Sequence, residues 1–418
     1  MRRDLFALLI AVRLLAAQQP TAKLDTTLFV TVGDGLAAGM SNYGLMQEAQ
    51  EKSFPAQIAR QMNTAFPQPL IQGPGLGDVI GYQALPSRIP AYPATTVRVY
   101  PTPLPGAGAA PPLFVFNLSI PGAKLADVVA LRPAPPLIQK NNRRQTLVNM
   151  MLGFPALILE KDAPLWSQLE YGEAMNPTFV LIQLGYSEAL EAIEAGDPSL
   201  APAAAAFRAT YATIVKRLRA TNAEVMVTTV PDPLDTAYFT TAAVAASMLR
   251  TNAASLAQAY GLAAGDLFTR NALSTIGNGL LRGGLPPLPP GSILRAAAAA
   301  DIRAGVRAIN AEILNVAREN GATVYDLQAF LTRVRTAGVT AGANRLTADY
   351  LGGFYSLDGV YPAATGHALI ANDILASINR TYATSFAPVD AAAVYLADPA
   401  TKYKLASGAS FAGAEVSQ

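Results

Sequence analysis

The chain has 418 residues, of which 51% are hydrophobic and 14% are charged, and its formal net charge at pH 7 is +2. A chain this apolar can bury a large core, which excludes intrinsic disorder as its general state. The sequence has no basic runs and no alternation of basic and aromatic residues, so we do not expect it to bind nucleic acid. Cysteine is absent, which excludes disulfides, a thiolate nucleophile, cysteine-ligated zinc and a lipid anchor on an N-terminal cysteine.

The first 17 residues have the pattern of a secretory signal peptide. Arg2 and Arg3 precede an apolar run over residues 5–12, and a small residue, Ala17, stands where cleavage would occur. Arg13 interrupts this pattern, so a buried first helix is the alternative. No later stretch reaches about 18 uninterrupted apolar residues, the length needed to cross a bilayer. We therefore expect a secreted or periplasmic protein with no membrane span in the mature chain.

Apolar segments rich in β-branched residues predict four buried parallel strands and a weaker fifth. In chain order they cover residues 28–32, 113–118, 178–184, 224–230 and 323–327. Apolar residues at three- and four-residue spacing predict helices over residues 53–62, 201–219, 301–320 and 366–380. This alternation predicts an α/β fold, a three-layer α/β/α sandwich with a mainly parallel five-stranded sheet covered on both faces.

Three long connections interrupt the alternation of strands and helices. They span about residues 66–112, 131–176 and 239–290, and the first is rich in proline and glycine. Connections of this length usually form functional rims or lids. We interpret them as insertions in a single domain over residues 24–382, followed by a tail at 383–418 that we expect to be loosely held.

Candidate site residues follow the strands, because ligands of open parallel sheets bind beyond the carboxyl ends of the strands. The turns in question cover residues 33–39, 117–123, 185–188, 231–233 and 356–362. The first turn reads GDGLAAG and runs on to KSFPAQIA, which begins at Lys52. The sequence NPTFV leads into the third strand, VPD ends the fourth, and FYSLDGV precedes the last helix.

These motifs resemble those of the GDSL, or SGNH, hydrolases, and most closely the envelope-associated branch. The resemblance extends in the correct order from about Leu28 to Tyr382. It implies the flavodoxin-like fold of that family and a relationship to secreted ester hydrolases of the lipase and acylhydrolase type.

The family's functional residues are a serine in the first turn, a glycine in the second, an asparagine in the third, and an aspartate and a histidine three residues apart before the last helix. The resemblance places these roles on Gly35, Gly122, Ser187, Asp358 and Tyr361, respectively. Only Gly122 and Asp358 match the family's residue types.

The three replacements remove the chemistry of acyl transfer, which needs a hydroxyl whose proton an imidazole accepts. Gly35 has no side chain, and Tyr361, with an ordinary pKa near 10, is a poor base at pH 7. Ser187 could still offer a hydroxyl to an oxyanion, together with backbone N–H groups near Gly35 and Gly122. A single weakened donor there would cost on the order of 3 kcal/mol of transition-state stabilisation.

Other side chains could replace the lost groups. His367, the only histidine, follows Tyr361 by six residues, which on a helix points it away from Tyr361, so we interpret it as a structural residue at a helix start. Ser41 and Ser53 lie outside the tight strand-to-helix turn that exposes a nucleophile. Ser119 is interpreted as a turn-forming residue.

Asp34, Glu188 and Asp358 each lie on a turn of the candidate site. They could converge to bind a divalent cation, or act as an acid/base pair on a glycoside. We favour the interpretation that Asp34 and Asp358 are hydrogen-bond acceptors that organise their loops, and we expect neither a metal nor a cofactor.

The sequence leaves three functions open. The favoured one is an exported, catalytically inactive or impaired relative of ester hydrolases that binds a small-molecule, acyl, glycan or lipid-like ligand in the remaining cleft. The second is an active hydrolase that uses the three carboxylates. The third is a protein-interaction module of the cell envelope that meets its partner through the proline-rich insertion at 66–112.

Overall fold

The computed structural model describes residues 24–71, 75, 98–99, 115–139, 142–154, 156–160 and 162–403. The expected signal peptide, most of the proline-rich insertion and the last fifteen residues lie outside this part of the chain. Within it, no helix is both long enough and apolar enough to pass through a membrane.

A parallel sheet of four strands, in the order β1-β4-β5-β9, forms the centre of the fold. The strands are β1 (Phe29–Gly33), β4 (Phe179–Gln183), β5 (Glu224–Thr228) and β9 (Thr323–Tyr325). Every residue of β1 and β4 is buried. Continuous burial is expected of strands that are covered by helices on both faces, and it explains why their sequences are apolar throughout.

The predicted five-stranded sheet is corrected to four strands with a bridged segment at one edge. In the described residues, the strand predicted at 113–118 makes a single parallel bridge, between Asn117 and Thr31. The N–H of Thr31 donates to Phe116 O (2.9 Å), and the N–H of Leu118 donates to Thr31 O (2.9 Å), so this segment lies beside β1. The N–H of Ile120 also donates to Gly33 O (3.1 Å), so the segment follows β1 to its last residue although it is bridged at one position.

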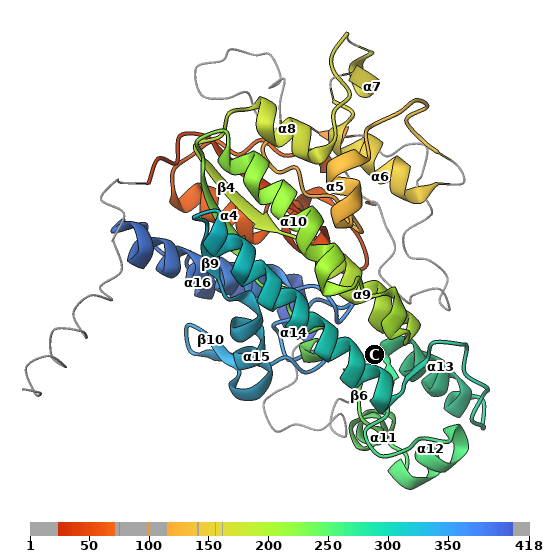
Figure 1. Cartoon of the computed structure of the whole chain (residues 1–418). Helices are drawn as coiled ribbons and strands as arrows, with labels where there is room; N and C mark the ends of the chain where they lie inside the picture. The colour runs from red at the N-terminus through yellow and green to blue at the C-terminus, as the bar shows by residue number, and fades with distance from the viewer. Residues whose placement is uncertain are drawn as a thin grey trace, which may run out of the picture.

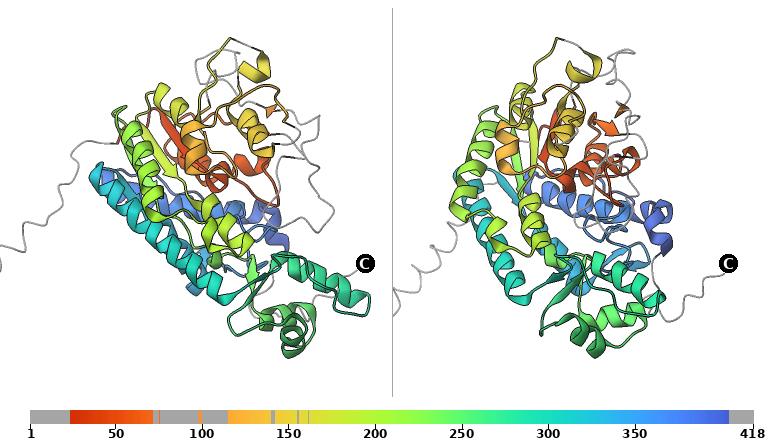
Figure 2. Two further views of the ribbon diagram at one scale, coloured as in Figure 1. Left: turned by 45° about the vertical axis from the view of Figure 1, so that its right-hand side comes forward. Right: turned by 90° about the vertical axis from the view of Figure 1, so that its right-hand side faces the viewer.

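Helices cover both faces of the sheet, as Figures 1 and 2 show. One layer contains α5 (Leu125–Ala130), α8 (Gln168–Ala174), α10 (Ala204–Arg219) and α14 (Ala296–Glu319). On the other face, α4 (Phe54–Gln61) packs against α16 (Ala364–Tyr382), with α15 (Leu327–Ala337) beside it. The three-layer α/β/α arrangement predicted from the sequence is therefore confirmed.

Shorter elements complete the body of the fold. They are α2 (Gly35–Ala38), α3 (Gln47–Gln50), α6 (Arg143–Leu152), α7 (Ala156–Leu159), α9 (Tyr186–Ala195), and the antiparallel pairs β2–β3 (Leu70–Ile71, Arg98–Val99) and β10–β11 (Val339–Ala341, Asn344–Leu346).

The insertion expected at 239–290 forms a separate lobe that projects from one end of the molecule (Figure 1). Its elements are β6 (Phe239–Thr240), α11 (Ala242–Leu249), α12 (Ala253–Tyr260), β7 (Leu267–Thr269), α13 (Arg270–Leu281) and β8 (Ile293–Leu294). The lobe has a small core of its own, centred on Phe268, Leu256 and Ile276. Asp266 connects it to the main body by accepting hydrogen bonds from Arg295 and from the N–H of Ala296 at the start of α14.

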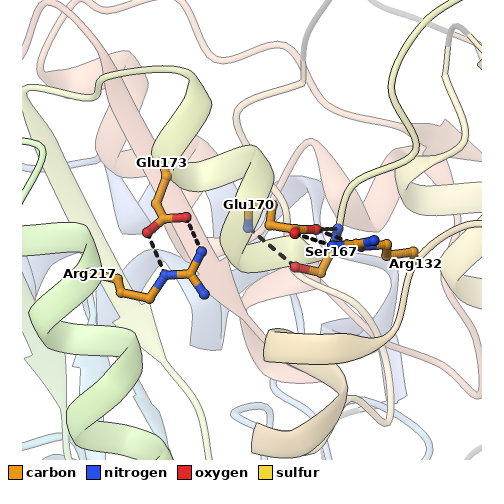
Figure 3. Close-up of polar contacts among 5 residues, drawn as sticks. All are labelled: Arg132, Ser167, Glu170, Glu173 and Arg217. Carbon is orange, nitrogen blue, oxygen red and sulfur yellow. Dashed lines mark hydrogen bonds and ion pairs between the residues drawn. The ribbon is translucent and has the colours of Figure 1, made fainter.

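The end of the second expected insertion, α8, is part of the helical layer and is fixed on both sides by arginine–glutamate pairs (Figure 3). Ser167 caps the helix and Glu170 closes a capping box with it. Arg132 donates to Glu170 (Nε to Oε2, 2.8 Å), while Arg217 of α10 donates to Glu173 (Nε to Oε1, 2.6 Å). The Arg132 side chain lowers the pKa of Glu170 to about 2. Because the side chains of these pairs are partly solvated, the pairs orient α8 and add little to stability.

The segment after α16 is packed against the body, so the expectation of a loosely held tail is wrong for residues 384–403. It contains α17 (Ala391–Ala397) and ends in a 3₁₀ turn. Asp398 accepts hydrogen bonds from the N–H (2.8 Å) and hydroxyl (2.7 Å) of Thr365 in the first turn of α16. The residue before α16, Ala363, has no side chain that could cap it. Asp398 supplies the missing cap from outside the helix.

This arrangement predicts that Asp398→Ala will destabilise the protein by about 2 kcal/mol, because it leaves a buried helix N-terminus without an acceptor. The free energy of unfolding in urea measures the effect. Glu319→Ala, which removes an exposed ion pair with Arg208, is the comparison and should cost less than about 1 kcal/mol. Equal losses in the two variants would contradict the capping role of Asp398.

Candidate functional site

The candidate site lies at the carboxyl ends of β1 and β4, where the order of the sheet reverses around β1. Such a reversal is the usual ligand position in an open α/β sheet, because the loops on either side diverge there. The turn after β1 carries Gly35, the turn after the edge segment carries Gly122, and the first turn of α9 carries Ser187. The loop that precedes α16 brings Asp358 and Tyr361 to the same end of the sheet.

Asp34 connects the turn after β1 to the first turn of α9 and is completely buried. Its Oδ1 accepts the N–H of Leu36 in α2 (3.2 Å), and its Oδ2 accepts the N–H of Ser187 in α9 (3.0 Å). Burial raises the pKa of Asp34 to about 6, although the N–H donors oppose this rise. Asp34 therefore has the loop-organising role that we favoured, and both of its oxygens are occupied.

Tyr361 occupies the space in which a side chain on residue 35 would lie. A Cβ atom built on Gly35 would be 2.6 Å from the hydroxyl oxygen of Tyr361 and 3.1 Å from its Cζ. Contacts of that length are strongly repulsive. Gly35 is thus the residue type that allows Tyr361 to lie where it does, and the two residues form one structural unit.

The ring of Tyr361 is held on several sides and is only 4% exposed. It packs edge to face against Tyr186, with ring centroids 6.2 Å apart and planes at 82°. Burial, with smaller contributions from Asp34 and Asp358, raises the pKa of the Tyr361 hydroxyl well above its ordinary value of 10. The phenol is therefore protonated at neutral pH and cannot serve as a general base.

Asp358 holds the loop that carries Tyr361. Its Oδ1 accepts the N–H groups of Val360 (2.7 Å) and Tyr361 (2.8 Å), and its Oδ2 accepts the N–H of Tyr43 (3.3 Å). Burial raises the pKa of Asp358, and these donors oppose the rise. No imidazole lies against Asp358 to be oriented, so this aspartate acts here on backbone groups.

The two residues at the expected oxyanion positions differ in accessibility. Gly122 is exposed, has a φ of 74°, and a Cβ built on it would meet no atom of the described residues within 4 Å. Ser187 is largely buried, and its N–H is used by Asp34. The side of the site next to Gly122 is therefore open, whereas the side next to Gly35 is filled.

Glu188 is buried behind the site and joins α9 to α5. Its Oε1 accepts the N–H of Leu125 (2.7 Å), and its Oε2 has no hydrogen-bond partner among the residues that the structure describes. Burial raises the pKa of Glu188 to about 7, with a smaller contribution from Asp34. Among the described residues, no group of three or more histidine, aspartate or glutamate side chains is close enough to hold a metal ion.

Sequence reasoning missed two buried glutamines that support the first turn. Gln183, at the end of β4, accepts the N–H of Ala37 (3.0 Å), and Gln168 donates to Gly33 O (2.8 Å). The signal for Gln183 was present, since it is a polar residue that ends a buried strand. Nothing in the sequence pattern around Gln168 places it beneath β1.

The alternative nucleophiles and base have structural roles. Ser53 caps α4 by accepting the N–H of Ala56 (3.4 Å). His367 lies in the first turn of α16, where its Nδ1 accepts the N–H of Phe54 (3.3 Å), which confirms the helix-start interpretation. The N–H of Ser119 donates to the side chain of Asn117 within its turn (3.2 Å).

Comparison with known proteins gives no match to a family model and no match among curated proteins. Among solved structures, a protein named TesA is 14% identical and aligns over 84% of this chain and 98% of its own, with a TM-score of 0.32. An extracellular lipase from Streptomyces rimosus has the same identity and coverages, with a TM-score of 0.37. Sequence identities and TM-scores this low do not indicate an activity for this chain.

Because residues 35 and 361 compete for one space, we expect the effect of a substitution at residue 35 on stability to depend on residue 361. Gly35→Ala should lower the free energy of unfolding by about 1–3 kcal/mol, because the new methyl group overlaps the Tyr361 hydroxyl. In a Tyr361→Ala background the same substitution should cost nothing, which gives a coupling of similar size in a double-mutant cycle.

Gly305→Ala is the control for that cycle, since its Cβ would meet only Ala201, at 3.9 Å, in a regular part of α14. It should be neutral or stabilising by up to about 1 kcal/mol. A Gly35→Ala penalty that persists unchanged without the tyrosine ring would show that the two residues do not compete for space.

The buried carboxyl of Glu188 predicts a pH dependence. With a folded pKa of about 7 and an unfolded value near 4.3, its favourable contribution is complete below the unfolded value and is lost as the pH rises through 7. Glu188→Gln keeps the bond from Leu125 and removes the titration. Urea unfolding should show wild type losing on the order of 2–3 kcal/mol relative to this variant between pH 4 and pH 8. Parallel stability curves would contradict the burial effect.

Proposed function

We propose that this chain is an exported SGNH-hydrolase-like protein that no longer performs acyl transfer and that binds an acyl, glycan or lipid-like ligand beside its former active site. The inference that acyl transfer is lost rests on the overlap of a Cβ on residue 35 with the Tyr361 hydroxyl, at 2.6 Å. The nucleophile's side chain is absent and its place is filled. The motifs that resemble the family supply the ancestry, and the pattern of residues 1–17 supports export.

Loss of the base reinforces loss of the nucleophile. A protonated, buried phenol at 361 cannot accept a proton from an attacking hydroxyl or water near neutral pH. General-base and nucleophilic steps are the two that convert binding into acyl transfer. With both removed, what remains available to the site is binding.

The open turn around Gly122 supports ligand binding on one side of the site. Because its positive φ and lack of a side chain leave the backbone exposed, a carbonyl or phosphoryl oxygen could approach it closely. The acyl, glycan or lipid-like character of the ligand is inferred from the family resemblance. We propose binding at this turn and not at Gly35, where Tyr361 excludes it.

An active hydrolase that uses Asp34, Glu188 and Asp358 has less support. Asp34 and Asp358 are fully buried, and all four of their oxygens accept backbone N–H groups. Of the six carboxylate oxygens, Oε2 of Glu188 alone lacks a partner in the described part of the chain, and it too is buried. A carboxylate that cannot reach solvent or substrate cannot act as a general acid or base on it.

The proposal is tested by rebuilding the site. The wild type and Gly35→Ser alone should show no hydrolysis of p-nitrophenyl acetate or butyrate above background, because the serine lacks a base and overlaps Tyr361. The double variant Gly35→Ser/Tyr361→His restores a hydroxyl, an imidazole and the space between them, and it should gain measurable turnover. Adding Ser187→Asn should raise that turnover further by restoring the family's donor.

The control for the rebuilt site is Asp358→Asn in the double variant, which should lower the gained turnover because the imidazole loses its orienting acceptor. Turnover by the wild type that disappears in Glu188→Gln would overturn the proposal and establish carboxylate chemistry instead. Circular dichroism and thermal unfolding confirm that each variant is folded.

A further inference from the structure

The last connection of the insertion lobe is an exposed segment rich in proline. Residues 283–291 read GGLPPLPPG, and residues 285–289 form neither helix nor strand. Proline fixes its own φ near −65°, and a residue that precedes proline is held in the extended or polyproline II region. Leu285, Pro286, Leu288 and Pro289 each precede a proline. The sequence itself therefore favours a polyproline II conformation over these residues.

The segment has one side against the lobe and another toward solvent. Pro286 and Leu288 are half-buried, and Leu288 packs against the small core of the lobe. Pro287, Pro289 and Pro290 are exposed. Residues three apart lie on the same side of a polyproline II helix, so Pro287 and Pro290 form an outward row with a spacing of about 9 Å.

Contacts with the lobe hold this segment in place. The hydroxyl of Tyr260 donates to Pro286 O (3.0 Å), and a Cβ built on Gly279 of α13 would overlap the Pro286 ring. At the other end, the N–H of Ser292 donates to Pro289 O (3.2 Å). Because the segment is already ordered, a partner that binds it loses little conformational entropy.

The side chains beside the prolines make this surface apolar, with one cation at its edge. Leu281, the last residue of α13, is 88% exposed, and Leu285 is 39% exposed. Arg282 is exposed and is the single charged residue between residues 271 and 294. A partner surface that complements this one is apolar, and its charge is negative and not positive.

The backbone of the segment distinguishes a protein groove from a lipid surface. A polyproline II segment has no internal hydrogen bonds, so its carbonyl groups need donors from outside. The interior of a bilayer offers none. Tryptophan and tyrosine side chains in a protein groove donate N–H and O–H groups, while their rings cover the prolines. An aromatic groove therefore satisfies both the rings and the carbonyl groups.

We propose that residues 285–290 are a docking segment for a partner protein that has an acidic, aromatic-lined groove. Pro287 and Pro290 enter the groove, and Arg282 meets its acidic edge. This docking is independent of the proposed function at Gly122, because the lobe contributes no residue to that site.

The experiment compares the whole protein with its own segment as a free peptide. The probe is a ¹⁵N-labelled WW domain of net negative charge that binds the sequence PPLP in an aromatic groove. The unlabelled protein should shift the groove signals of the probe in a saturable manner, at least as tightly as the peptide GGLPPLPPGS does. Absence of saturation, or binding about tenfold weaker than that of the peptide, would show that the lobe hides the segment and would overturn the proposal.

Variants identify the residues that the probe recognises. Pro287→Ala/Pro290→Ala removes the outward row, and the affinity for the probe should fall about tenfold or more. Arg282→Glu should weaken binding several-fold, because it repels an acidic groove. Pro388→Ala, which changes an exposed proline of the main body, is the matched control and should bind as the wild type does. Thermal unfolding confirms that each variant is folded. Unchanged affinity in the proline variant or in the arginine variant would contradict this mode of recognition.

Vesicles test the alternative occupant of the same surface. The protein should stay in the supernatant when vesicles of phosphatidylcholine and phosphatidylglycerol are sedimented. Sedimentation that Leu281→Ser abolishes and Pro287→Ala/Pro290→Ala retains would assign this surface to a membrane and reject docking on a protein groove.

Discussion

The ring of Tyr361 occupies the space that a side chain on residue 35 would need, so residue 35 is a glycine while that ring is present. The hydroxyl of Tyr361 lies 2.6 Å from where a Cβ on residue 35 would be. Three neighbouring contacts hold the ring and the turn in this arrangement. Tyr186 packs against the ring, Asp358 holds the backbone of its loop, and Asp34 fixes the turn that contains Gly35. The filled side of the site is therefore a packed part of the core.

The carboxylates of the site have structural roles that do not depend on any reaction. Asp34, Asp358 and Glu188 all accept backbone N–H groups, and those bonds join β1, α2, α5, α9 and the loop before α16. Removing any of them would leave buried donors without acceptors, which is a cost to stability whether or not a reaction takes place. The need to pair these buried N–H groups is therefore sufficient to explain why the three positions are acidic.

The sheet and its helical layers could be predicted from the sequence because buried parallel strands and amphipathic helices have local periodic patterns. Four strands and the helices α4, α10, α14 and α16 lie where those patterns placed them, within a few residues. The edge segment at Asn117 could not be judged in this way, because pairing depends on the partner strand as well as on its own residues.

Long-range contacts account for what the sequence could not predict. The turn carrying Gly35 could be placed at the end of a strand, but the ring that fills its side space comes from residue 361, more than three hundred positions later. The C-terminal segment was misjudged because its alanine-rich composition says nothing of Asp398, whose target is the start of a helix thirty-three residues earlier. Burial of His367 depends likewise on α4, whose Phe54 N–H donates to its Nδ1 from more than three hundred positions earlier.

The cap that Asp398 places on α16 has a consequence for the order in which the chain matures. During synthesis α16 emerges before its cap, and until Asp398 arrives the first turn of that helix has no side-chain acceptor from its own flank. The loop with Asp358 and Tyr361 leads directly into this turn. A residue near the far end of the described chain therefore helps to fix the helix start that follows the candidate site, so a change in that distant segment can reach the site without touching any of its residues.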